Sequence, residues 1–486
     1  MDSAFDILVI GAGVVGNAVA RELCRRRVRV GVVEAAPDLC AGTSGRNSGV
    51  LHAGFNNTPG TKMAKFCVAG NRGFDALAAE LDVPLRRPGK LVVGFTPDDR
   101  AQLEAMIARG KENGVPGLQL VGRAFIREKA PAVAGDFAMW SPSTAILDPF
   151  QLTIGLAENA AKNGAQYFFR SPVTAIARTE HGYTVTAGKH TLTARWIVNC
   201  AGLGAARIAE LLGIGGYQLH PCRGEYFILD KRVGPLLPLP AYPVPNYKTG
   251  GLGIHLTPTI DGNVLIGPST EYIPRDDDYS STQKIQDLLL ADGARIFPHI
   301  RREHFIRNFA GIRPKLAAKS EGGYHDFIIE RRAEAPHAIN LVGIESPGLT
   351  SCLPIAREVI RLIEEVEPLE KNPAFDPIRR RIVTFRDKTP AEQAALIAAD
   401  PDYGEVICRC EGITRAEVLA ALRGPLPAQT MSGIKYRCRA MMGRCQGGYC
   451  QTRLAELLMQ ELGLTREEVL YKYEDSYLFT GEVQPL

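Results

Sequence analysis

Residues 5–36 read FDILVIGAGVVGNAVARELCRRRVRVGVVEAA, and this stretch sets the architecture of the N-terminal part. An apolar run, a glycine turn, an amphipathic segment and a second apolar run predict a strand–helix–strand unit. Gly11 permits the tight turn, Gly13 lets the backbone approach a pyrophosphate, and Gly16 lets helix and strand pack closely. Glu34 ends the second run, where its carboxylate can accept hydrogen bonds from ribose hydroxyls. The stretch therefore predicts a dinucleotide at the N-terminus of a helix.

The composition is that of a globular protein with several domains. The chain has 486 residues, 45% apolar and 23% charged, so roughly two to three domains are expected. The net charge is +4, and Lys and Arg are interspersed with Asp and Glu, which argues against nucleic-acid binding. The opening MDSAFDILVIGAG lacks a basic region before a long apolar stretch, and no apolar run could span a bilayer. We expect a cytoplasmic protein without a transmembrane segment, whose membrane contact, if any, is peripheral.

The residues after Glu34 indicate FAD as the dinucleotide. They read GTSGRNSGVLHAGFNN and are rich in Gly, Ser and Asn, as expected of a loop that lies along an extended cofactor. Residues 195–213 and 338–363 each read as a buried strand, a small-residue turn and an amphipathic helix, and the second helix could stabilise a reduced flavin through its dipole. A second GxGxxG unit with its own acid is absent from the sequence, so we expect no separate nicotinamide domain. The cofactor-binding candidates in these three segments are Thr43, Ser44, Arg46, Asn47, Ser48, Ala201, Gly202, Gly348, Leu349 and Thr350.

Three further motifs resemble one known family. They are SPSTAILDPFQL, RGEYFILD and GIHLTPTIDGNVLIGP. With the glycine-rich stretches, they resemble FAD-dependent oxidoreductases of the D-amino acid oxidase superfamily over most of residues 5–360, and within it the glycerol-3-phosphate and L-2-hydroxyglutarate dehydrogenase branches. The resemblance implies an α/β fold, in which a Rossmann-type FAD-binding domain is interleaved with an α+β substrate domain of mostly antiparallel sheet. It also adds Val173 to the cofactor-binding candidates.

Three residues are candidates for the chemistry of this family. Oxidation of an alcohol or amine gives a hydride to flavin N5 and leaves a proton for a base, a role that suits histidine. The resemblance places His52 beside the isoalloxazine ring and His255 on a strand roofing the substrate pocket, and a packing role stays open for both. Arg313 resembles the substrate-anchoring arginine of the superfamily, because a guanidinium can bind carboxylate or phosphate through two bonds. Gly311 and Pro314 beside it suggest a fixed turn.

The predicted substrate is a small anion. Residues 58–93 are most similar to glycerol-3-phosphate dehydrogenases, whereas RGEYF and GIHLTP also suit the 2-hydroxyglutarate enzymes, and both groups oxidise a secondary alcohol. We therefore expect a substrate like glycerol 3-phosphate. L-2-Hydroxyglutarate or another 2-hydroxy acid is the alternative, and a subunit of a heteromeric amine or imino-acid dehydrogenase is a third possibility within the superfamily.

Four cysteines form two close pairs near the C-terminal end. One residue separates Cys408 from Cys410, and four residues separate Cys445 from Cys450. Thiolates on a small helical module can hold an iron–sulfur cluster or zinc, although structural zinc pairs usually have two to four residues between the thiols. Residues 404–456 resemble the bacterioferritin-associated ferredoxin-like [2Fe-2S] domain, which implies that the four cysteines ligate a [2Fe-2S] cluster. Zinc and an empty site remain alternatives.

A flavin and an iron–sulfur centre in one chain predict a path for electrons. The flavin takes two electrons as hydride and the cluster carries single electrons, so we expect transfer to a quinone or a redox protein, with partner subunits open. The alternative is a structural or regulatory cluster. Cys438, a fifth thiol in the segment, is expected to be a neighbour of the cluster. The expected domains are an oxidoreductase core at 1–365 (FAD-binding at 1–80, 145–215 and 335–365; substrate-binding at 81–144 and 216–334), a linker at 366–403, a small helical [2Fe-2S] domain at 404–460 and a tail at 461–486.

Overall fold

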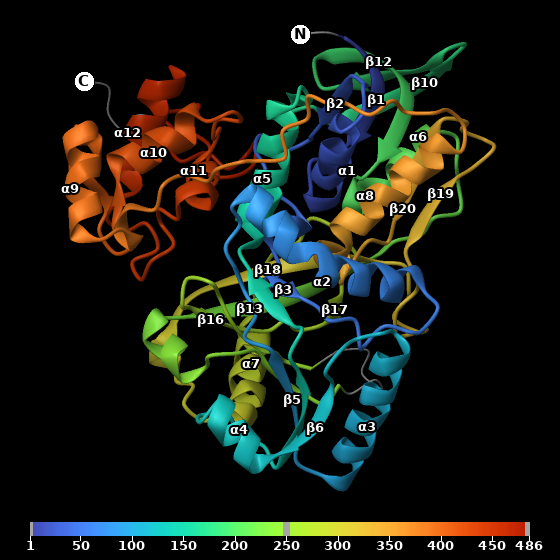
Figure 1. Cartoon of the computed structure of the whole chain (residues 1–486). Helices are drawn as coiled ribbons and strands as arrows, with labels where there is room; N and C mark the ends of the chain where they lie inside the picture. Colours follow the sequence, from blue (N-terminus) through green and yellow to red (C-terminus); the bar gives the residue numbers. More distant parts are fainter. Residues whose placement is uncertain (1–2, 246–252, 482–486) are drawn as a thin grey trace.

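The structure, a computed structural model, describes residues 3–245 and 253–481 (Figure 1). The predicted unit at the N-terminus is present as β1 (Ala4–Ile10), α1 (Val14–Cys24) and β2 (Val30–Val33). Parts of the expected substrate domain and tail, residues 246–252 and 482–486, lie outside the described residues, as do residues 1–2 of the expected core.

The first sheet has eight strands and a parallel centre. Its parallel strands follow the order β9, β2, β1, β12, β20, and β10, β11 and β19 add antiparallel edges. This order brings together three separate stretches of the chain, as expected of an interleaved domain. Besides β1 and β2, the strands of this sheet are β9 (Gln166–Phe168), β10 (Val173–Thr179), β11 (Gly182–Ala187), β12 (His190–Asn199), β19 (Ile328–Arg331) and β20 (Ala338–Val342).

Alternate residues of β1 build the hydrophobic layers on the two faces of this sheet. Ile7 and Val9 belong to the cluster that includes α1, while Leu8 and Ile10 belong to the cluster that includes the β10–β12 strands. On the first face α1 packs against α5 and α8, and α2 packs against α8; α6 contacts β10, β12 and β20. The helices are α2 (Lys62–Leu81), α5 (Pro149–Lys162), α6 (Ala205–Leu211) and α8 (Gly348–Glu364).

Two glycines of the N-terminal motif are required by close backbone contacts. Gly11 has φ +103°, and a Cβ there would lie 2.6 Å from the carbonyl oxygen of Cys200. A Cβ on Gly16 would lie 1.9 Å from the carbonyl oxygen of Gly11. A side chain could not be accommodated at either distance, so both positions need glycine. Gly11 lets the first turn approach the end of β12, and Gly16 lets α1 pack against the turn that follows β1.

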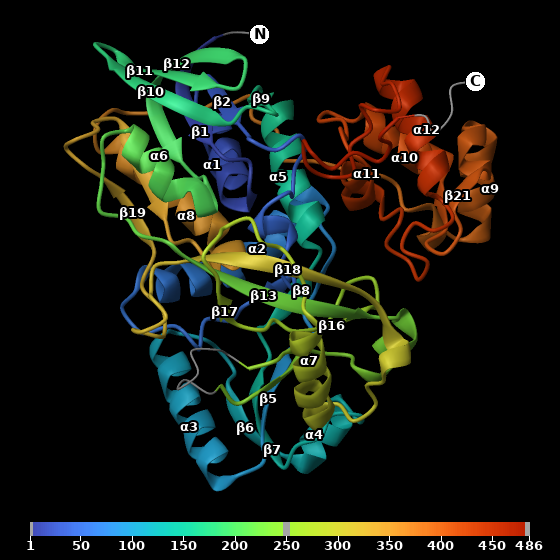
Figure 2. The ribbon, with the colours of Figure 1, turned by 180° about the vertical axis from the view of Figure 1, so that it is seen from behind.

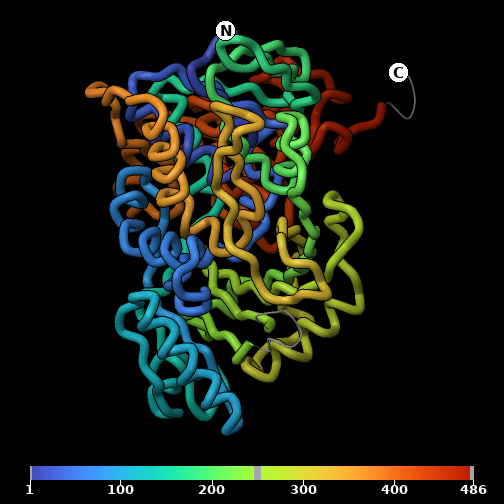
Figure 3. The backbone as a smooth tube through the Cα atoms, turned by 90° about the vertical axis from the view of Figure 1, so that its right-hand side faces the viewer, coloured from blue at the N-terminus to red at the C-terminus, as the bar shows by residue number. Residues whose placement is uncertain are grey.

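In the part of the chain that the structure describes, the second sheet has nine strands and is antiparallel except for the β14–β5 pair. It lies with α3, α4 and α7 at the end of the molecule opposite the N-terminus (Figure 3). The predicted α+β domain of mostly antiparallel sheet is confirmed. Its elements are β5 (Lys90–Gly94), α3 (Pro97–Glu112), β6 (Gln119–Gly122), α4 (Arg123–Lys129), β7 (Phe137–Ser141), β13 (His220–Leu229), β14 (Ala241–Pro243), β15 (Leu256–Pro258), β16 (Val264–Ile266), β17 (Glu271–Tyr272), α7 (Gln283–Ile296) and β18 (Phe305–Lys315). A small third sheet joins β3 (Val50–Leu51), β8 (Ala145–Leu147) and β4 (Leu85–Arg86).

The C-terminal part is a small helical domain with its own apolar core, and it lies beside α5 (Figure 2). The segment expected to be a linker, 366–403, contains the helix α9 in addition to extended chain. None of the described helices is long and apolar enough to cross a bilayer. The elements of this part are α9 (Pro390–Ala399), β21 (Val406–Cys408), β22 (Ile413–Thr414), α10 (Arg415–Arg423), α11 (Met431–Cys438) and α12 (Gln451–Leu462).

Candidate functional site

A cavity of about 650 Å³ lies where the two large sheets meet, a volume in the range of cofactor and ligand sites. Strand ends and loops from both domains line it, so it gathers most of the residues chosen from the sequence. Those in its wall are Gly11, Gly13, Glu34, Thr43, Ser44, Arg46, Asn47, Ser48, His52, Val173, Ala201, Gly202, His255, Arg313, Gly348 and Leu349.

Two of the cofactor-binding candidates lie behind the wall. Gly16 packs within α1 against Gly11. Thr350 lies in the first turn of α8 with no exposed surface, and its hydroxyl accepts a hydrogen bond from the backbone N–H of His52 at 3.0 Å. Thr350 thus fixes the loop that carries His52.

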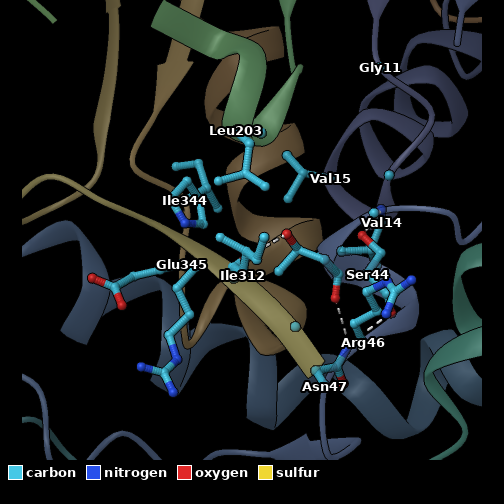
Figure 4. Close-up of a pocket in the computed structure, with 18 of the residues that line it drawn as sticks. Gly11, Val14, Val15, Ser44, Arg46, Asn47, Leu203, Ile312, Ile344 and Glu345 are labelled. Atoms are coloured by element: carbon cyan, nitrogen blue, oxygen red, sulfur yellow. Dashed lines mark hydrogen bonds between the residues drawn. The ribbon is translucent and has the colours of Figure 1, made fainter. Parts of the chain in front are cut away.

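The end of the cavity beside α1 is built to receive a dinucleotide. The Glu34 carboxylate accepts hydrogen bonds from the backbone N–H groups of Ala12 (2.8 Å) and Ala36 (2.9 Å). Burial raises the pKa of Glu34, and these N–H groups oppose that shift. Figure 4 shows Gly11, Val14 and Ser44 on the same side of the cavity, where the Ser44 hydroxyl accepts a hydrogen bond from the Val14 N–H. The close glycine backbone, the helix N-terminus and the fixed carboxylate fit the pyrophosphate and ribose of FAD.

His52 is held in the loop after β3. Its carbonyl oxygen accepts a hydrogen bond from the side-chain amide of Asn71 (3.0 Å), and its Nε2 lies 3.4 Å from the Ser346 hydroxyl. Burial, together with the positive charge of Lys90, lowers the pKa of His52 to about 3. The imidazole is therefore neutral at neutral pH and can accept a hydrogen bond.

His255 lies directly before β15 and is backed by groups that the sequence analysis did not single out. Its ring stacks on that of Tyr242, with centroids 3.4 Å apart. The Lys90 Nζ lies 4.2 Å from the centre of the Tyr242 ring and 4.5 Å from that of Phe55, and it has no hydrogen-bond partner among the described residues. Burial lowers the pKa of Lys90 to about 7. The sequence signal that could have identified Lys90 was a lysine at the start of an otherwise apolar strand, KLVVG.

Arg313 lies in the strand β18, so the expectation of a fixed turn was wrong. Pro314 is opposite Pro221 of β13, and the strand β18 continues through it to Lys315. Gly311 serves a close contact instead, since its Cβ would lie 2.2 Å from the carbonyl oxygen of Arg46.

The Arg313 guanidinium is held by uncharged partners. Its Nη2 donates to the carbonyl oxygen of Ser269 (2.7 Å), and its Nη1 lies 3.3 Å from the Cys222 sulfur. Gly224 leaves room for it, because a Cβ there would lie 2.7 Å from Nη2. Burial alone would lower the pKa of Arg313, but Cys222, Tyr226 and neighbouring groups raise it overall. The side chain therefore brings a positive charge to the wall of the cavity.

A buried ion pair lies next to Arg313. The Lys315 Nζ is 3.1 Å and 3.2 Å from the two carboxylate oxygens of Glu345, which lines the cavity. Burial raises the pKa of Glu345, and Lys315 opposes that shift. Since these two charges offset each other, Arg313 leaves a net positive charge at this end, which suits an anionic group. Glu345 was missed because nothing in ESPG indicates a lysine thirty residues earlier in the chain.

The four predicted thiols lie together in the C-terminal domain. The sulfur atoms of Cys408 and Cys410 are 3.9 Å apart and those of Cys410 and Cys445 are 3.6 Å apart. Two thiolates on one tetrahedral metal lie roughly 3.8 Å apart, given metal–sulfur bonds of about 2.3 Å. Gly443 makes the space, since its Cβ would lie 2.3 Å from the Cys410 sulfur.

The thiols differ in exposure. Cys408 and Cys450 are fully buried, whereas Cys410 and Cys445 are exposed. Among the described residues, no three His, Cys, Asp or Glu side chains converge on a position for a single metal ion. The contacts Cys450–Cys408, Cys408–Cys410 and Cys410–Cys445 instead form a row of thiols with a buried and an exposed end, and this donor set fits an iron–sulfur cluster with one edge toward solvent.

The cysteine domain is fastened to the core by buried polar contacts. The Arg437 Nη2 donates to the Asp38 carboxylate at 2.9 Å, and both side chains are at least 95% buried. The Gln151 amide donates to the carbonyl oxygens of Tyr436 and Arg437. From the tail, the Tyr473 hydroxyl accepts a hydrogen bond from Arg46, in the loop beside the main cavity. This tail contact was not predicted.

Comparisons with known proteins agree with this geometry. Residues 6–362 match the family described as FAD dependent oxidoreductase, and residues 406–460 match the BFD-like [2Fe-2S] binding domain. The chain is 36% identical to a glycerol 3-phosphate dehydrogenase of Caloramator mitchellensis, with 98% of each chain covered. It is 32% identical to a mitochondrial L-2-hydroxyglutarate dehydrogenase of Arabidopsis thaliana, over 73% of this chain and 82% of the relative.

A solved structure shares the fold of the core. Dithionite-reduced L-α-glycerophosphate oxidase from Mycoplasma pneumoniae with FAD bound aligns with a TM-score of 0.71 and 27% identity, over 78% of this chain and 99% of that one. The family match over residues 6–362 agrees with the close glycine backbone at the dinucleotide end of the cavity. The match over residues 406–460 agrees with the row of thiols. The chain therefore belongs to the FAD dependent oxidoreductase family and carries a BFD-like [2Fe-2S] binding domain in its C-terminal part.

Proposed function

We propose that this protein oxidises the secondary alcohol of a small anion, glycerol 3-phosphate or a close analogue, and passes the electrons through its [2Fe-2S] cluster to a quinone or a redox protein. The observation that carries the proposal is the similarity to a glycerol 3-phosphate dehydrogenase along 98% of both chains, cysteine domain included. The net positive charge that Arg313 brings to the cavity supports an anionic substrate.

Bound FAD would supply the acceptor of a hydride at its N5 atom. The residues that would hold it are Gly11, Gly13 and Glu34 at the dinucleotide end, with Gly348 and Leu349 at the N-terminus of α8. Arg313 would bind the anionic group of the substrate and so orient the carbon that loses the hydride.

The two cavity histidines would divide the remaining work. A general base is most effective when its pKa lies near the working pH, and the pKa of His52 is lowered to about 3 by burial and Lys90. We therefore assign His255 to accept the hydrogen bond and then the proton of the substrate hydroxyl, and His52 to position the substrate as a neutral imidazole. The Tyr242 ring stacked on His255 would hold its imidazole in orientation.

The thiol cluster offers an exit for electrons. Cys410 and Cys445 are exposed, so a cluster on the four thiols would present one edge to an acceptor outside the chain. This exposure favours a role in electron transfer over a purely structural role, for which a buried cluster would suffice.

A second candidate substrate is a 2-hydroxy acid. It is favoured by the L-2-hydroxyglutarate dehydrogenase relative, which is 32% identical across the core. A carboxylate and a phosphate both suit Arg313, because a guanidinium binds either through two hydrogen bonds.

Anaerobic bleaching of the flavin distinguishes these substrates. Purified protein would be mixed with glycerol 3-phosphate, L-2-hydroxyglutarate, other 2-hydroxy acids or imino acids, and the loss of flavin absorbance followed. We expect glycerol 3-phosphate to bleach the flavin fastest. Fastest bleaching by a 2-hydroxy acid would transfer the assignment to that class, and bleaching by imino acids alone would refute the oxidation of an alcohol.

A further inference from the structure

A second cavity, of about 170 Å³, lies between the core and the cysteine domain. From the core, the wall includes the loop from Gly45 to Ser48, residues 147–150 at the start of α5, residues 259–265, and Arg307 and Phe309 of β18. From the C-terminal part, it includes α11 and the tail. We call it the interdomain cavity. Residues 46–48 also line the main cavity, so the two cavities share a wall.

Lys435, Lys472 and Arg307, three of the positive side chains in this wall, have no acidic partner among the described residues. Lys435 is 6% exposed, and its Nζ has neither a hydrogen bond nor an ion pair among the described residues. Lys472 is likewise without an acid in the described part of the chain, and its Nζ lies 5.6 Å and 5.2 Å from the ring centres of Tyr436 and Tyr473. Within the described ranges, the Arg307 guanidinium donates only to the neutral amide oxygen of Gln446, at 3.0 Å.

The acids that reach the same wall form no ion pair with Lys435, Lys472 or Arg307. The Asp261 carboxylate pairs with Arg386 (2.9 Å) and Arg439 (2.5 Å). The Asp148 carboxylate caps α5 by accepting hydrogen bonds from the backbone N–H groups of Phe150 and Gln151. The wall thus carries five cationic side chains (Arg46, Arg307, Lys435, Arg439 and Lys472) against two carboxylates (Asp148 and Asp261), and Lys435, Lys472 and Arg307 have no ion-pair partner among the described residues.

Such an arrangement is unfavourable while the cavity holds only water. Burying a charged group without a partner costs free energy, and a protein usually avoids it. Burial and the nearby Arg307 and Arg439 lower the pKa of Lys435 to about 7, which reflects the missing counter-charge. The pKa of Lys472 is lowered as well, by burial and then by Arg46. An anion between these side chains would remove the penalty.

We propose that the interdomain cavity binds a small organic anion, a phosphate monoester or a carboxylate, through Lys435, Lys472 and Arg307. A cavity of about 150 Å³ holds a benzene ring, so about 170 Å³ admits an anion of a few carbon atoms or a single ring. The rings of Phe309 and of the stacked Phe150–Tyr436 pair complete the wall. The positive charge favours an anion over a neutral ring of equal size.

The location of the interdomain cavity decides which parts of the chain a bound anion would connect. Lys435 lies on α11 and Lys472 in the tail, both in the part of the chain that follows the core, whereas Arg307 belongs to the core sheet. An anion that contacts all three would tie the cysteine domain to the antiparallel sheet and to the loop shared with the main cavity. This site does not depend on which alcohol the enzyme oxidises.

Calorimetric titration of the holoenzyme with inorganic phosphate tests the site. The titrations use Arg313→Gln, so that the main cavity contributes less phosphate binding. We expect saturable binding to this variant, and about tenfold or greater weakening when Lys435→Met or Lys472→Met is added. Lys189→Met, which removes an exposed charge from the β11–β12 turn, is the matched control and should leave the affinity unchanged.

The chemical class is tested with benzoate and benzyl alcohol, which have similar size and differ in charge. Benzoate should bind about tenfold or more tightly than the alcohol, and only benzoate should weaken in the two lysine variants. The proposal is refuted if phosphate shows no saturable binding, if both lysine variants bind it as tightly as the Lys189 control, or if the alcohol binds as well as benzoate. If one lysine variant fails to fold, the other gives the result. Lys435→Met removes a buried amine without an acidic partner among the described residues, so it should raise the unfolding temperature measured without anions.

Discussion

Arg313 carries a charge that its own surroundings leave uncompensated. Its partners are a carbonyl oxygen and a thiol, and the neighbouring Glu345 carboxylate is paired with Lys315. We predict that Arg313→Gln lowers kcat/KM for glycerol 3-phosphate by about 10²-fold or more, because two charge-assisted hydrogen bonds to the substrate are lost. Steady-state rates with an artificial electron acceptor measure this change.

Arg313→Lys is the matched control for that prediction. It keeps the charge and loses the planar fork, so it should recover part of kcat/KM and leave KM above that of the wild type. Equal kcat/KM in the wild type and the glutamine variant would remove Arg313 from the substrate site.

Lys90 makes a prediction about stability and pH. Burial lowers its pKa in the folded protein from 10.5 to about 7, so between these values the unfolded chain binds more protons and stability rises with pH. We predict that the free energy of unfolding of the wild type increases from pH 7 to pH 9 by about 2 kcal/mol more than that of Lys90→Met. Denaturant unfolding of both proteins at the two pH values measures the difference.

Lys189→Met, on the surface, should follow the wild type at both pH values and serves as the control. Identical pH dependence in the wild type and Lys90→Met would show that the buried lysine keeps its proton throughout this range. Lys435 and Lys472 are present in all three proteins, so their titration cancels in the comparison.

At the level of single residues, roles set by a local motif were predictable and roles set by distant contacts were not. Gly11 and Glu34 were identified because their roles depend on neighbours within one short motif, and both line the cavity. Lys90, Tyr242 and Glu345 were missed because each owes its place to a distant segment: Lys90 contacts Tyr242, and Glu345 pairs with Lys315. Such contacts have no local pattern of spacing.

At the scale of elements, periodicity and capping predict more than composition does. The strand–turn–helix layouts around residues 195–213 and 338–363 are present as β12 with α6 and β20 with α8. The segment 366–403 was expected to be a linker on the basis of its prolines and charges, yet Thr389 caps α9 with a complete capping box to Glu392, and Pro390 is at its first turn. TPAE is a helix-start pattern, so this helix was predictable.

The two cysteine pairs lie beside different elements, one at the end of β21 and the other before α12, and they support a prediction about their joint role. Cys445→Ser should lose the iron–sulfur EPR signal of dithionite-reduced protein and most of its iron, because a ligand is removed from the row of thiols. Flavin content and turnover with an artificial acceptor that oxidises flavin directly should remain. Turnover with a quinone or a one-electron redox protein should fall at least about tenfold.

Cys438→Ser is the control for this prediction. Cys438 is buried in the same domain, but its sulfur contacts the carbonyl oxygen of Ile434 instead of another thiol. It should keep the EPR signal. Loss of the signal in both variants would disprove the assignment of ligands, and normal turnover of Cys445→Ser with every acceptor would make the cluster structural.

The whole molecule depends on contacts that span hundreds of residues. Arg46 meets Tyr473 of the tail, Asp38 meets Arg437, and Asp261 meets Arg439. The sequence predicted the two cofactor modules separately, because each has local motifs. It could not predict how they dock, since one partner of each pair lies in the core and the other near the C-terminal end, with no shared pattern.

The Asp38–Arg437 pair provides the test of this docking. Both side chains are buried, and removal of one partner leaves the other charge uncompensated. Asp38→Asn and Arg437→Met should each lower the free energy of unfolding by about 3–5 kcal/mol, and the double variant should lose less than the sum of the two. Denaturant unfolding gives these values.

The function of the docking is measured in the same proteins. Asp277→Asn, which breaks an exposed pair with Arg275, is the control and should leave the unfolding free energy unchanged. In the single variants of the buried pair, turnover with a quinone or a redox protein should fall relative to turnover with an acceptor that oxidises flavin directly, because the cluster is no longer held against the core. A constant ratio of the two rates, despite lower stability, would mean that electrons leave the flavin without passing through the cysteine domain.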